Sequence, residues 1–225
     1  MNKLIYKILP VLFVLIISCE QDDTTDGVSR ITQYNDIELI GDQIIVLSQG
    51  TAFVDPGVIA FEGEEDVTEK VEVSGSVDNT EIGYNELSYN IVNKDGFAKT
   101  ITRTVLVVPS SVSSIDYSGT YTGVVSTGTH LNATVITKIA NGVFEASDFF
   151  GGRYNIGYGY GPAYRLKTYF YVNADNTTYT SLWNNSPWGP WFFINMKVSG
   201  TTFSHKVIST PDPASFGFDV TLIKQ

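Results

Sequence analysis

Two segments in the C-terminal half of the chain combine large aromatic side chains with glycine, proline and asparagine. Residues 149–164 contain five glycines and four tyrosines, and residues 183–191 read Trp-Asn-Asn-Ser-Pro-Trp-Gly-Pro-Trp. A pyranose ring has an apolar face that stacks on indole or phenol rings, and a rim of hydroxyls that bond to amides and guanidinium groups. The sequence therefore predicts a glycan-binding surface. Its candidate residues are Trp183, Trp188, Trp191, Tyr158, Tyr160, Tyr164, Arg153 and Asn184, with Asn185 beside them.

The same composition has a structural interpretation. Glycine permits tight turns and proline stiffens a loop, so both segments are expected to be loops on a β scaffold. Aromatic, glycine-rich loops also plug the ends of barrels, and some of these rings would then belong to the core. The sequence leaves open which rings face solvent.

Catalysis has few candidate residues. Glycoside hydrolysis needs two carboxylates about 5 to 10 Å apart, and Glu145 and Asp148, just before the first aromatic segment, are the pair best placed for it. His130 and His205 are isolated and show no metal-binding HExxH spacing. We expect no enzyme activity, no catalytic residues, no cofactor and no metal.

One interpretation of the acids that cluster in the N-terminal half is a calcium site. Asp55 and the run Glu64-Glu65-Asp66 supply oxygen ligands, and Ca²⁺ takes six to eight of them. Their spacing matches no known calcium loop, and a charge run usually forms a solvated face. We therefore expect no metal here.

The first residues indicate where the protein is located. Lys3 and Lys7 precede an apolar run, residues 8–17, that is too short to span a bilayer comfortably, and Ser18-Cys19 ends it. This arrangement resembles the lipobox of bacterial lipoproteins. The resemblance implies that 1–19 is a signal peptide and that Cys19, the only cysteine, carries the lipid that anchors the protein to the outer membrane.

The next segment, residues 20–34, begins with Glu-Gln-Asp-Asp and is too polar to order itself. It is an acidic tether in the simplest interpretation. It also resembles the surface-export signal of Bacteroidetes lipoproteins, which implies display on the cell surface.

Charge and aromatic residues divide the rest of the chain in two. Residues 31–109 hold 14 acids and 4 bases, whereas residues 115–225 hold 6 acids, 7 bases and 21 of the 29 aromatic residues. The break is the serine-rich stretch 110–114, which has linker composition. We therefore predict domains at 35–109 and 115–225. Without Lys3 and Lys7 the net charge changes from −10 to −12, which excludes nucleic acid as a partner.

Alternation with a period of two dominates the first domain. Leu87, Tyr89 and Ile91 alternate with polar residues, and Asp95-Gly96 is a turn signal. Residues 50–58 (Gly-Thr-Ala-Phe-Val-Asp-Pro-Gly-Val) and the closing strand 103–107 resemble bacterial immunoglobulin-like domains. The resemblance implies a sandwich that serves as a spacer.

The second domain has longer, more aromatic strands. In the segment 191–198, Phe192, Ile194, Met196 and Val198 are expected to share one face. Seven to nine antiparallel strands predict a β-barrel or a second sandwich, so the whole protein is expected to be all-β, with an immunoglobulin-like sandwich followed by an antiparallel barrel or sandwich.

The segments 149–154 and 159–164, with the later Trp188-Gly189, resemble a Bacteroidetes surface lipoprotein family that has an immunoglobulin-like N-terminal domain and no assigned enzyme activity. Its members occur with glycan uptake systems of the starch-utilisation type. The resemblance implies an extracellular glycan and uptake-complex proteins as partners. The alternative is a structural or protein-interaction subunit of such a complex, with no ligand of its own.

Overall fold

The computed structural model describes residues 31–225. Cys19, the rest of the predicted signal peptide and residues 20–30 of the predicted acidic tether lie outside the described residues. Between residues 31 and 225 there is no helix that is both long and apolar enough to cross a membrane.

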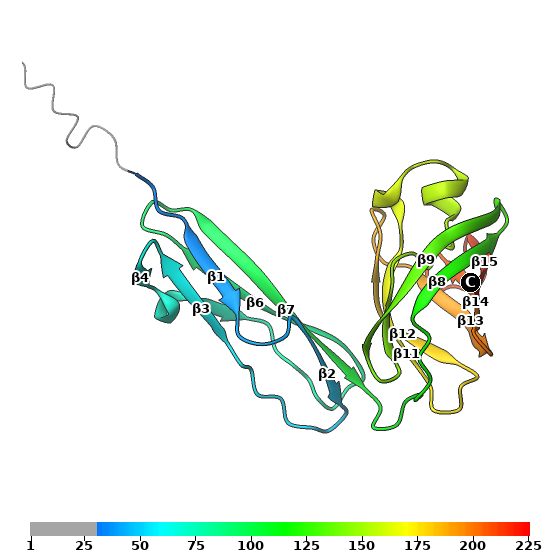
Figure 1. Ribbon diagram of the computed structural model, residues 1–225, viewed down its shortest axis with the longest axis horizontal. Coiled ribbons are helices and arrows are strands. Elements are labelled where there is room, and N and C mark those ends of the chain that lie inside the picture. Colours follow the sequence, from blue (N-terminus) through cyan, green and yellow to red (C-terminus); the bar gives the residue numbers. More distant parts are fainter. Residues whose placement is uncertain (1–30) are drawn as a thin grey trace, which may run out of the picture. The chain divides into compact units, whose positions relative to one another are not determined.

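The N-terminal domain is an immunoglobulin-like sandwich of two small sheets (Figure 1). One sheet has the order β1-β3-β4, and the other has the order β2-β7-β6-β5 with β2 parallel to β7. The elements are β1 (Asn35–Leu39), β2 (Ile44–Ser48), β3 (Val58–Glu62), β4 (Glu65–Asp66), the short helix η1 (Thr68–Lys70), β5 (Glu72–Ser74), β6 (Gly83–Val92) and β7 (Ala98–Val108). The predicted fold of this domain is confirmed.

Its core follows the predicted alternation, since Leu87, Tyr89 and Ile91 are all buried on one face of β6. A charged group is buried beside them. The Arg103 guanidinium is fully buried and donates to the carbonyl oxygens of Ile40 and Gly57 at 2.8 and 2.9 Å. These bonds fix the loops at one end of the sandwich, because a buried cation must find hydrogen-bond acceptors.

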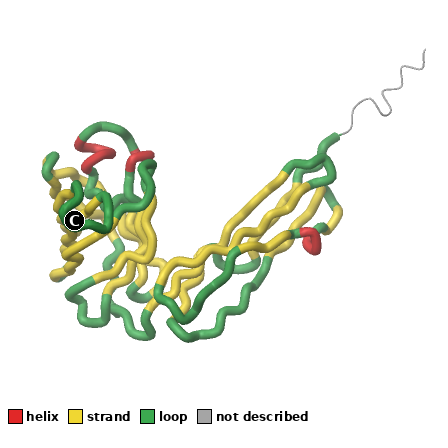
Figure 2. Tube along the Cα trace, turned by 180° about the vertical axis from the view of Figure 1, so that it is seen from behind, coloured by secondary structure: helices red, strands yellow, loops and turns green. Residues whose placement is uncertain are grey.

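The C-terminal domain is one antiparallel sheet that curls into a nearly closed barrel, with its helices together at one end (Figure 2). The strand order is β12-β11-β10-β9-β8-β15-β14-β13. The strands are β8 (Gly119–Val125), β9 (Gly128–Ala140), β10 (Val143–Ala146), β11 (Lys167–Val172), β12 (Tyr179–Asn185), β13 (Phe192–Ser199), β14 (Thr202–Ile208) and β15 (Gly217–Lys224). Of the two predicted architectures, the barrel-like one is present.

The prediction that Phe192, Ile194, Met196 and Val198 share one face of β13 is wrong for the residues before the bulge. Phe193, Met196 and Val198 pack against the core, whereas Phe192 is exposed. The pairing of β13 with β14 shifts between Ile194 and Lys197, and Asn195 in this bulge has a positive φ of 58°. A bulge inserts one residue and therefore reverses the side-chain alternation after it.

Within residues 31–225, hydrogen bonds join the two edge strands of the barrel, β12 and β13, at two points. The Asn184 side chain donates to Trp191 O at 2.9 Å and accepts from Trp191 N–H at 2.7 Å, so an amide group replaces a backbone partner. At the other end, Val198 N–H donates to Thr177 O at 2.8 Å. We call the stretch of β12 and β13 between these contacts the seam.

A neutral histidine lies in the barrel core. His205 is buried; its Nε2 lies 2.8 Å from Phe149 O and its Nδ1 lies 2.6 Å from the Tyr179 hydroxyl. The carbonyl can only accept, so Nε2 carries the proton and Nδ1 accepts from Tyr179. Burial lowers the pKa of His205 to about 4.

This histidine makes stability depend on pH. The unfolded imidazole, with a pKa of 6.5, binds a proton before the folded one does, so stability is present above pH 6.5 and is lost between pH 6.5 and 4. The loss from His205 is about 3 kcal/mol. Asp148, whose pKa burial raises to about 6, acts in the opposite sense.

The His205 contribution can be isolated by mutation, because the wild type and His205→Gln share Asp148. We expect the difference in unfolding free energy between these two proteins to shrink by about 3 kcal/mol from pH 7.5 to 4. Denaturant titrations at both pH values measure it, and an unchanged difference would contradict the assignment.

Candidate functional site

The two aromatic segments meet at one end of the barrel. Phe149 and Phe150 begin the first segment and are both fully buried in the barrel core. The chain then turns through Gly151, whose carbonyl oxygen lies 2.1 Å from where a Cβ on Gly123 of β8 would be. Only glycine at position 123 permits this approach of loop to strand, and so the loop is seated on the barrel wall.

Asp148 holds this loop in place. Its carboxylate is fully buried and accepts backbone N–H bonds from Phe150, Leu166 and Gly152 at 2.9, 3.1 and 3.2 Å. Burial raises the pKa of Asp148, and these three bonds oppose the rise. The contacts give Asp148 a role in shaping the loop.

Beyond the buried pair, five rings form a cluster that we call the aromatic cap: Tyr154, Tyr158, Tyr160, Tyr164 and Trp188. The first four come from the short helices η2 (Arg153–Gly157) and η3 (Pro162–Tyr164) and the turn between them, and Trp188 comes from the second segment.

Tyr154 is the centre of the aromatic cap. Its ring centroid lies 4.7 Å from Trp188 and 5.7 Å from Tyr158. Tyr158 and Tyr160 stack at 5.7 Å with their planes 24° apart. Tyr158, Tyr160 and Trp188 are 49%, 53% and 47% exposed, so three rings of the cap face solvent.

Two further predicted residues support the cap from beneath. Trp191 is half-buried and its ring lies 5.2 Å from Phe150. Arg153 is buried, its guanidinium carbon lies 4.4 Å from the Phe218 ring centroid, and it donates to the Ser126 and Tyr158 hydroxyls. Through these contacts, both residues support the exposed rings of the cap.

Trp183 and Asn184 are not brought into the cap. Trp183 stacks on Tyr84 at 5.3 Å and packs on Tyr169 at 5.4 Å, and Asn184 is engaged with the Trp191 backbone. Sequence reasoning missed the central role of Tyr154. The only signal for it was its position in the Gly/Tyr segment.

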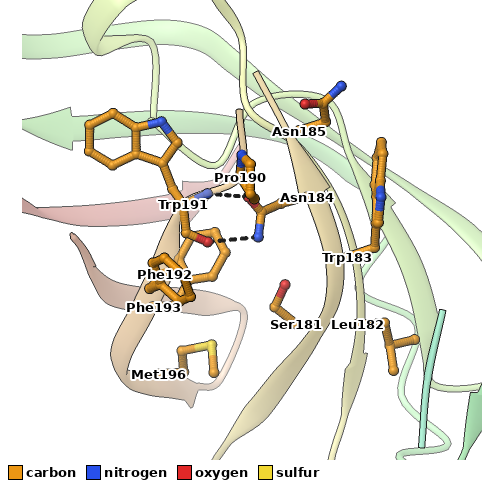
Figure 3. Close-up of a pocket in the computed structure, with 10 residues that line it drawn as sticks. All are labelled: Ser181, Leu182, Trp183, Asn184, Asn185, Pro190, Trp191, Phe192, Phe193 and Met196. Carbon is orange, nitrogen blue, oxygen red and sulfur yellow. Dashed lines mark hydrogen bonds between the residues drawn. The ribbon is translucent and has the colours of Figure 1, made fainter. Parts of the chain in front are cut away.

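A groove follows the seam (Figure 3). We call it the seam groove, and its volume is about 650 Å³. Its lining residues are Ser181, Leu182, Trp183, Asn184, Asn185, Pro190, Trp191, Phe192, Phe193 and Met196. None of them is charged.

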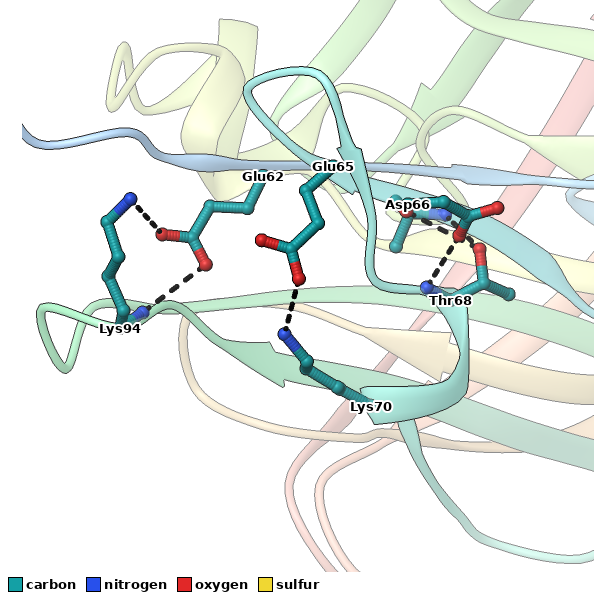
Figure 4. A network of polar contacts seen from close by, with 7 residues as sticks. Glu62, Glu65, Asp66, Thr68, Lys70 and Lys94 are labelled. Carbon is teal, nitrogen blue, oxygen red and sulfur yellow. Dashed lines mark hydrogen bonds and ion pairs between the residues drawn. The ribbon is translucent and has the colours of Figure 1, made fainter.

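The acidic cluster of the N-terminal domain is paired internally (Figure 4). Glu65 lies 3.2 Å from Lys70, Glu62 lies 3.4 Å from Lys94, and Asp66 accepts from Thr68 N–H at 2.9 Å. Asp55 accepts from the Tyr89 hydroxyl at 2.7 Å. In residues 31–225 no three His, Cys, Asp or Glu side chains gather as a metal site would need.

The fold is that of a two-domain β protein, an immunoglobulin-like sandwich followed by a nearly closed barrel. The family model "Bacterial surface protein, Ig-like domain" matches residues 37–107, and a second model, described as a C-terminal domain, matches residues 110–224. The crystal structure of the lipoprotein BT2262 from Bacteroides thetaiotaomicron is 34% identical, with 85% of this chain and 100% of that chain covered and a TM-score of 0.48. By that identity and coverage, the chain belongs to the BT2262 lipoprotein family.

A more remote likeness is to a Clostridium perfringens ZmpB structure that contains CBM51-2, in complex with GlcNAc, and INT domains. It is 13% identical and covers 84% of this chain and 43% of that one, with a TM-score of 0.31. A likeness this weak carries no argument about a ligand. A search of the curated proteins gives no match.

The structural role assigned to Asn184 can be tested by mutation. Asn184→Ala removes both bonds across the end of the seam, and we expect the free energy of unfolding to fall by about 2 kcal/mol. The neighbouring Asn185 is exposed, and Asn185→Ala should change it by less than about 0.5 kcal/mol. Urea denaturation measures both, and equal stability of the two variants would refute the role.

Proposed function

We propose that this protein is a lipid-anchored, surface-displayed, non-catalytic glycan-binding protein that stacks sugar rings on the aromatic cap. The observation that carries the proposal is the exposure of Tyr158, Tyr160 and Trp188 on one cluster built from two loops. Buried rings in the same loops would have supported only a plug.

The geometry of the cap suits a sugar. Tyr158 and Tyr160 stack within 24° of parallel, so their faces and edges form a firm apolar surface, and each phenol adds a hydroxyl that can donate and accept. The rings rest on Tyr154, Trp191 and Phe150, which are held by the barrel core. A surface that is already ordered loses little entropy when a ligand binds.

Family membership and the start of the sequence support the location. The BT2262 relative is a lipoprotein, and the N-terminal domain matches a bacterial surface module. Cys19 follows a short apolar run, as the lipobox resemblance requires. We propose that Cys19 is lipidated, that the acidic tether and the first domain serve as a spacer, and that the protein faces outward from the outer membrane.

The contacts of the two candidate catalytic acids support a binding function. Asp148 is occupied by three backbone N–H groups, and Glu145 lies 3.0 Å from the Lys167 ammonium. A general acid must reach the glycosidic oxygen of a bound sugar. Asp148 is buried beneath the loop that it holds.

Exposed rings of the cap should be needed for binding. In the chain from Glu20 to Gln225, we expect Trp188→Ala to weaken polysaccharide binding at least about tenfold and Tyr158→Ala about fivefold, because each change removes a stacking face. Affinity electrophoresis against starch, mixed-linkage β-glucan, xylan, galactomannan and polygalacturonate measures this.

The matched control is Phe97→Ala, which removes a ring of similar exposure (50%) from the N-terminal domain and should leave migration unchanged. If no polysaccharide retards the wild type, or if Trp188→Ala and Phe97→Ala behave alike, the glycan proposal fails. The structural-subunit interpretation would then replace it.

A further inference from the structure

The seam is an interruption in an otherwise continuous barrel wall. Thr177 bonds to Val198 at one end, and Asn184 bonds to Trp191 at the other. The same number of residues separates the two contacts on each strand, so neither strand is shifted along the other. Between these contacts no ladder joins β12 to β13 in the described chain. The strands therefore meet at both ends and separate in the middle.

A matched pair of bulges accounts for the separation. On β12, Leu182 is an extra residue, since Tyr169 pairs with Trp183 while Phe170 pairs with Ser181. On β13, Asn195 and Met196 oppose the single residue His205. Bulges bend strands and end their pairing, and they occur often beside functional sites. Both bulges lie between the two contacts, Leu182 on one of the strands that border the seam groove and Asn195 on the other.

We propose that the seam groove is a second sugar subsite, continuous with the aromatic cap, which binds the interior of an uncharged polysaccharide chain. The proposal rests on the glycan-binding function above and adds the class of ligand: a chain without carboxylates or sulfates that is long enough to cover both surfaces.

The chemistry of the groove supports an uncharged, hydroxyl-rich occupant. Its walls carry aromatic rings, Trp183 on one side and Phe192 on the other, and its polar side chains are the Ser181 hydroxyl and the amides of Asn184 and Asn185 (Figure 3). The backbone edges of β12 and β13 add donors and acceptors. No lining residue is charged in a chain of net charge −10, so nothing there would pair with an anionic sugar.

Continuity with the cap supports a chain rather than a single sugar. Trp191 lines the groove, and its ring lies 6.4 Å from Tyr154 at the centre of the cap. A volume of about 650 Å³ lies within the range of small-molecule sites, and the cap adds further surface. One chain can therefore contact both.

The closed ends of the seam argue against a peptide strand as the occupant. Strand addition needs an open edge along which the peptide can pair. Here the contacts at Thr177 and Asn184 block both ends of the gap, so an extended peptide cannot run through it. Sugar rings lying over the gap can still reach its polar groups.

The test compares short and long chains of one sugar on the protein from Glu20 to Gln225. From whichever of the five polysaccharides binds most tightly, oligosaccharides of two and about six units are titrated by calorimetry. Ser181→Phe fills the groove and should lower the affinity for the longer chain at least about tenfold, to that of the short one. Asn185→Ala, which removes only an exposed amide, should lower it about fivefold. Ser74→Phe, the same substitution on an exposed site of β5, should change nothing.

The outcomes separate this inference from the proposed function. If both groove variants bind the longer chain like the wild type while Trp188→Ala does not, the groove proposal is wrong and the cap function stands. A preference for polygalacturonate would overturn the uncharged class. If Trp188→Ala has no effect on either chain, the function itself fails. If Ser181→Phe has a lower melting temperature than the wild type, the affinity of Asn185→Ala for the longer chain decides. A loss of about fivefold supports the groove proposal, and no loss contradicts it.

Discussion

The burial of Phe149 and Phe150 in the end of the barrel is the interaction on which the exposed surface depends. Both side chains are fully buried, and Phe150 contacts rings from both aromatic loops, Tyr154 and Trp191 among them. With one cysteine in the chain, no internal disulfide can hold these loops. Their order comes from aromatic packing, from the Asp148 carboxylate that collects three backbone N–H groups, and from the close approach at Gly123.

A second constraint follows from closing a sheet on itself. Edge strands carry unpaired backbone groups that would otherwise recruit another chain. Here the amide of Asn184 and the bond between Val198 and Thr177 join the edges without a full ladder. The barrel thus avoids a long open edge and keeps a short opening in its wall. The bulges at Leu182 and Asn195 bring this about, at the cost of ladder bonds.

Much of the architecture could be predicted from local pattern, because side-chain alternation is a backbone property. It predicted the buried face of β6 and the antiparallel domain of residues 115–225. It failed within β13, since one inserted residue reverses the faces and nothing in the letters around Asn195 marks a bulge. The composition of residues 149–164 and 183–191 identified the two segments that supply the exposed aromatic rings. It could not distinguish exposed rings from packed ones, because Trp183 and Trp188 lie in the same motif. Only long-range contacts place Trp183 against Tyr84 and leave Trp188 exposed.

The two domains divide charge and aromatic surface between them, and this division has a physical consequence. Most acids lie in the immunoglobulin-like domain, where several are paired with lysines, whereas the barrel is nearly neutral. The proposed binding surface of rings, amides and hydroxyls would gain no long-range attraction for its ligand, so each contact would be short-ranged and weak. Weak contacts bind a polymer well when many repeat along one chain and many copies of the binder share one surface, since the second contact is then intramolecular. The proposed lipid anchor and spacer domain would supply that arrangement, and the proposed continuity of cap and groove would extend the same principle within one molecule.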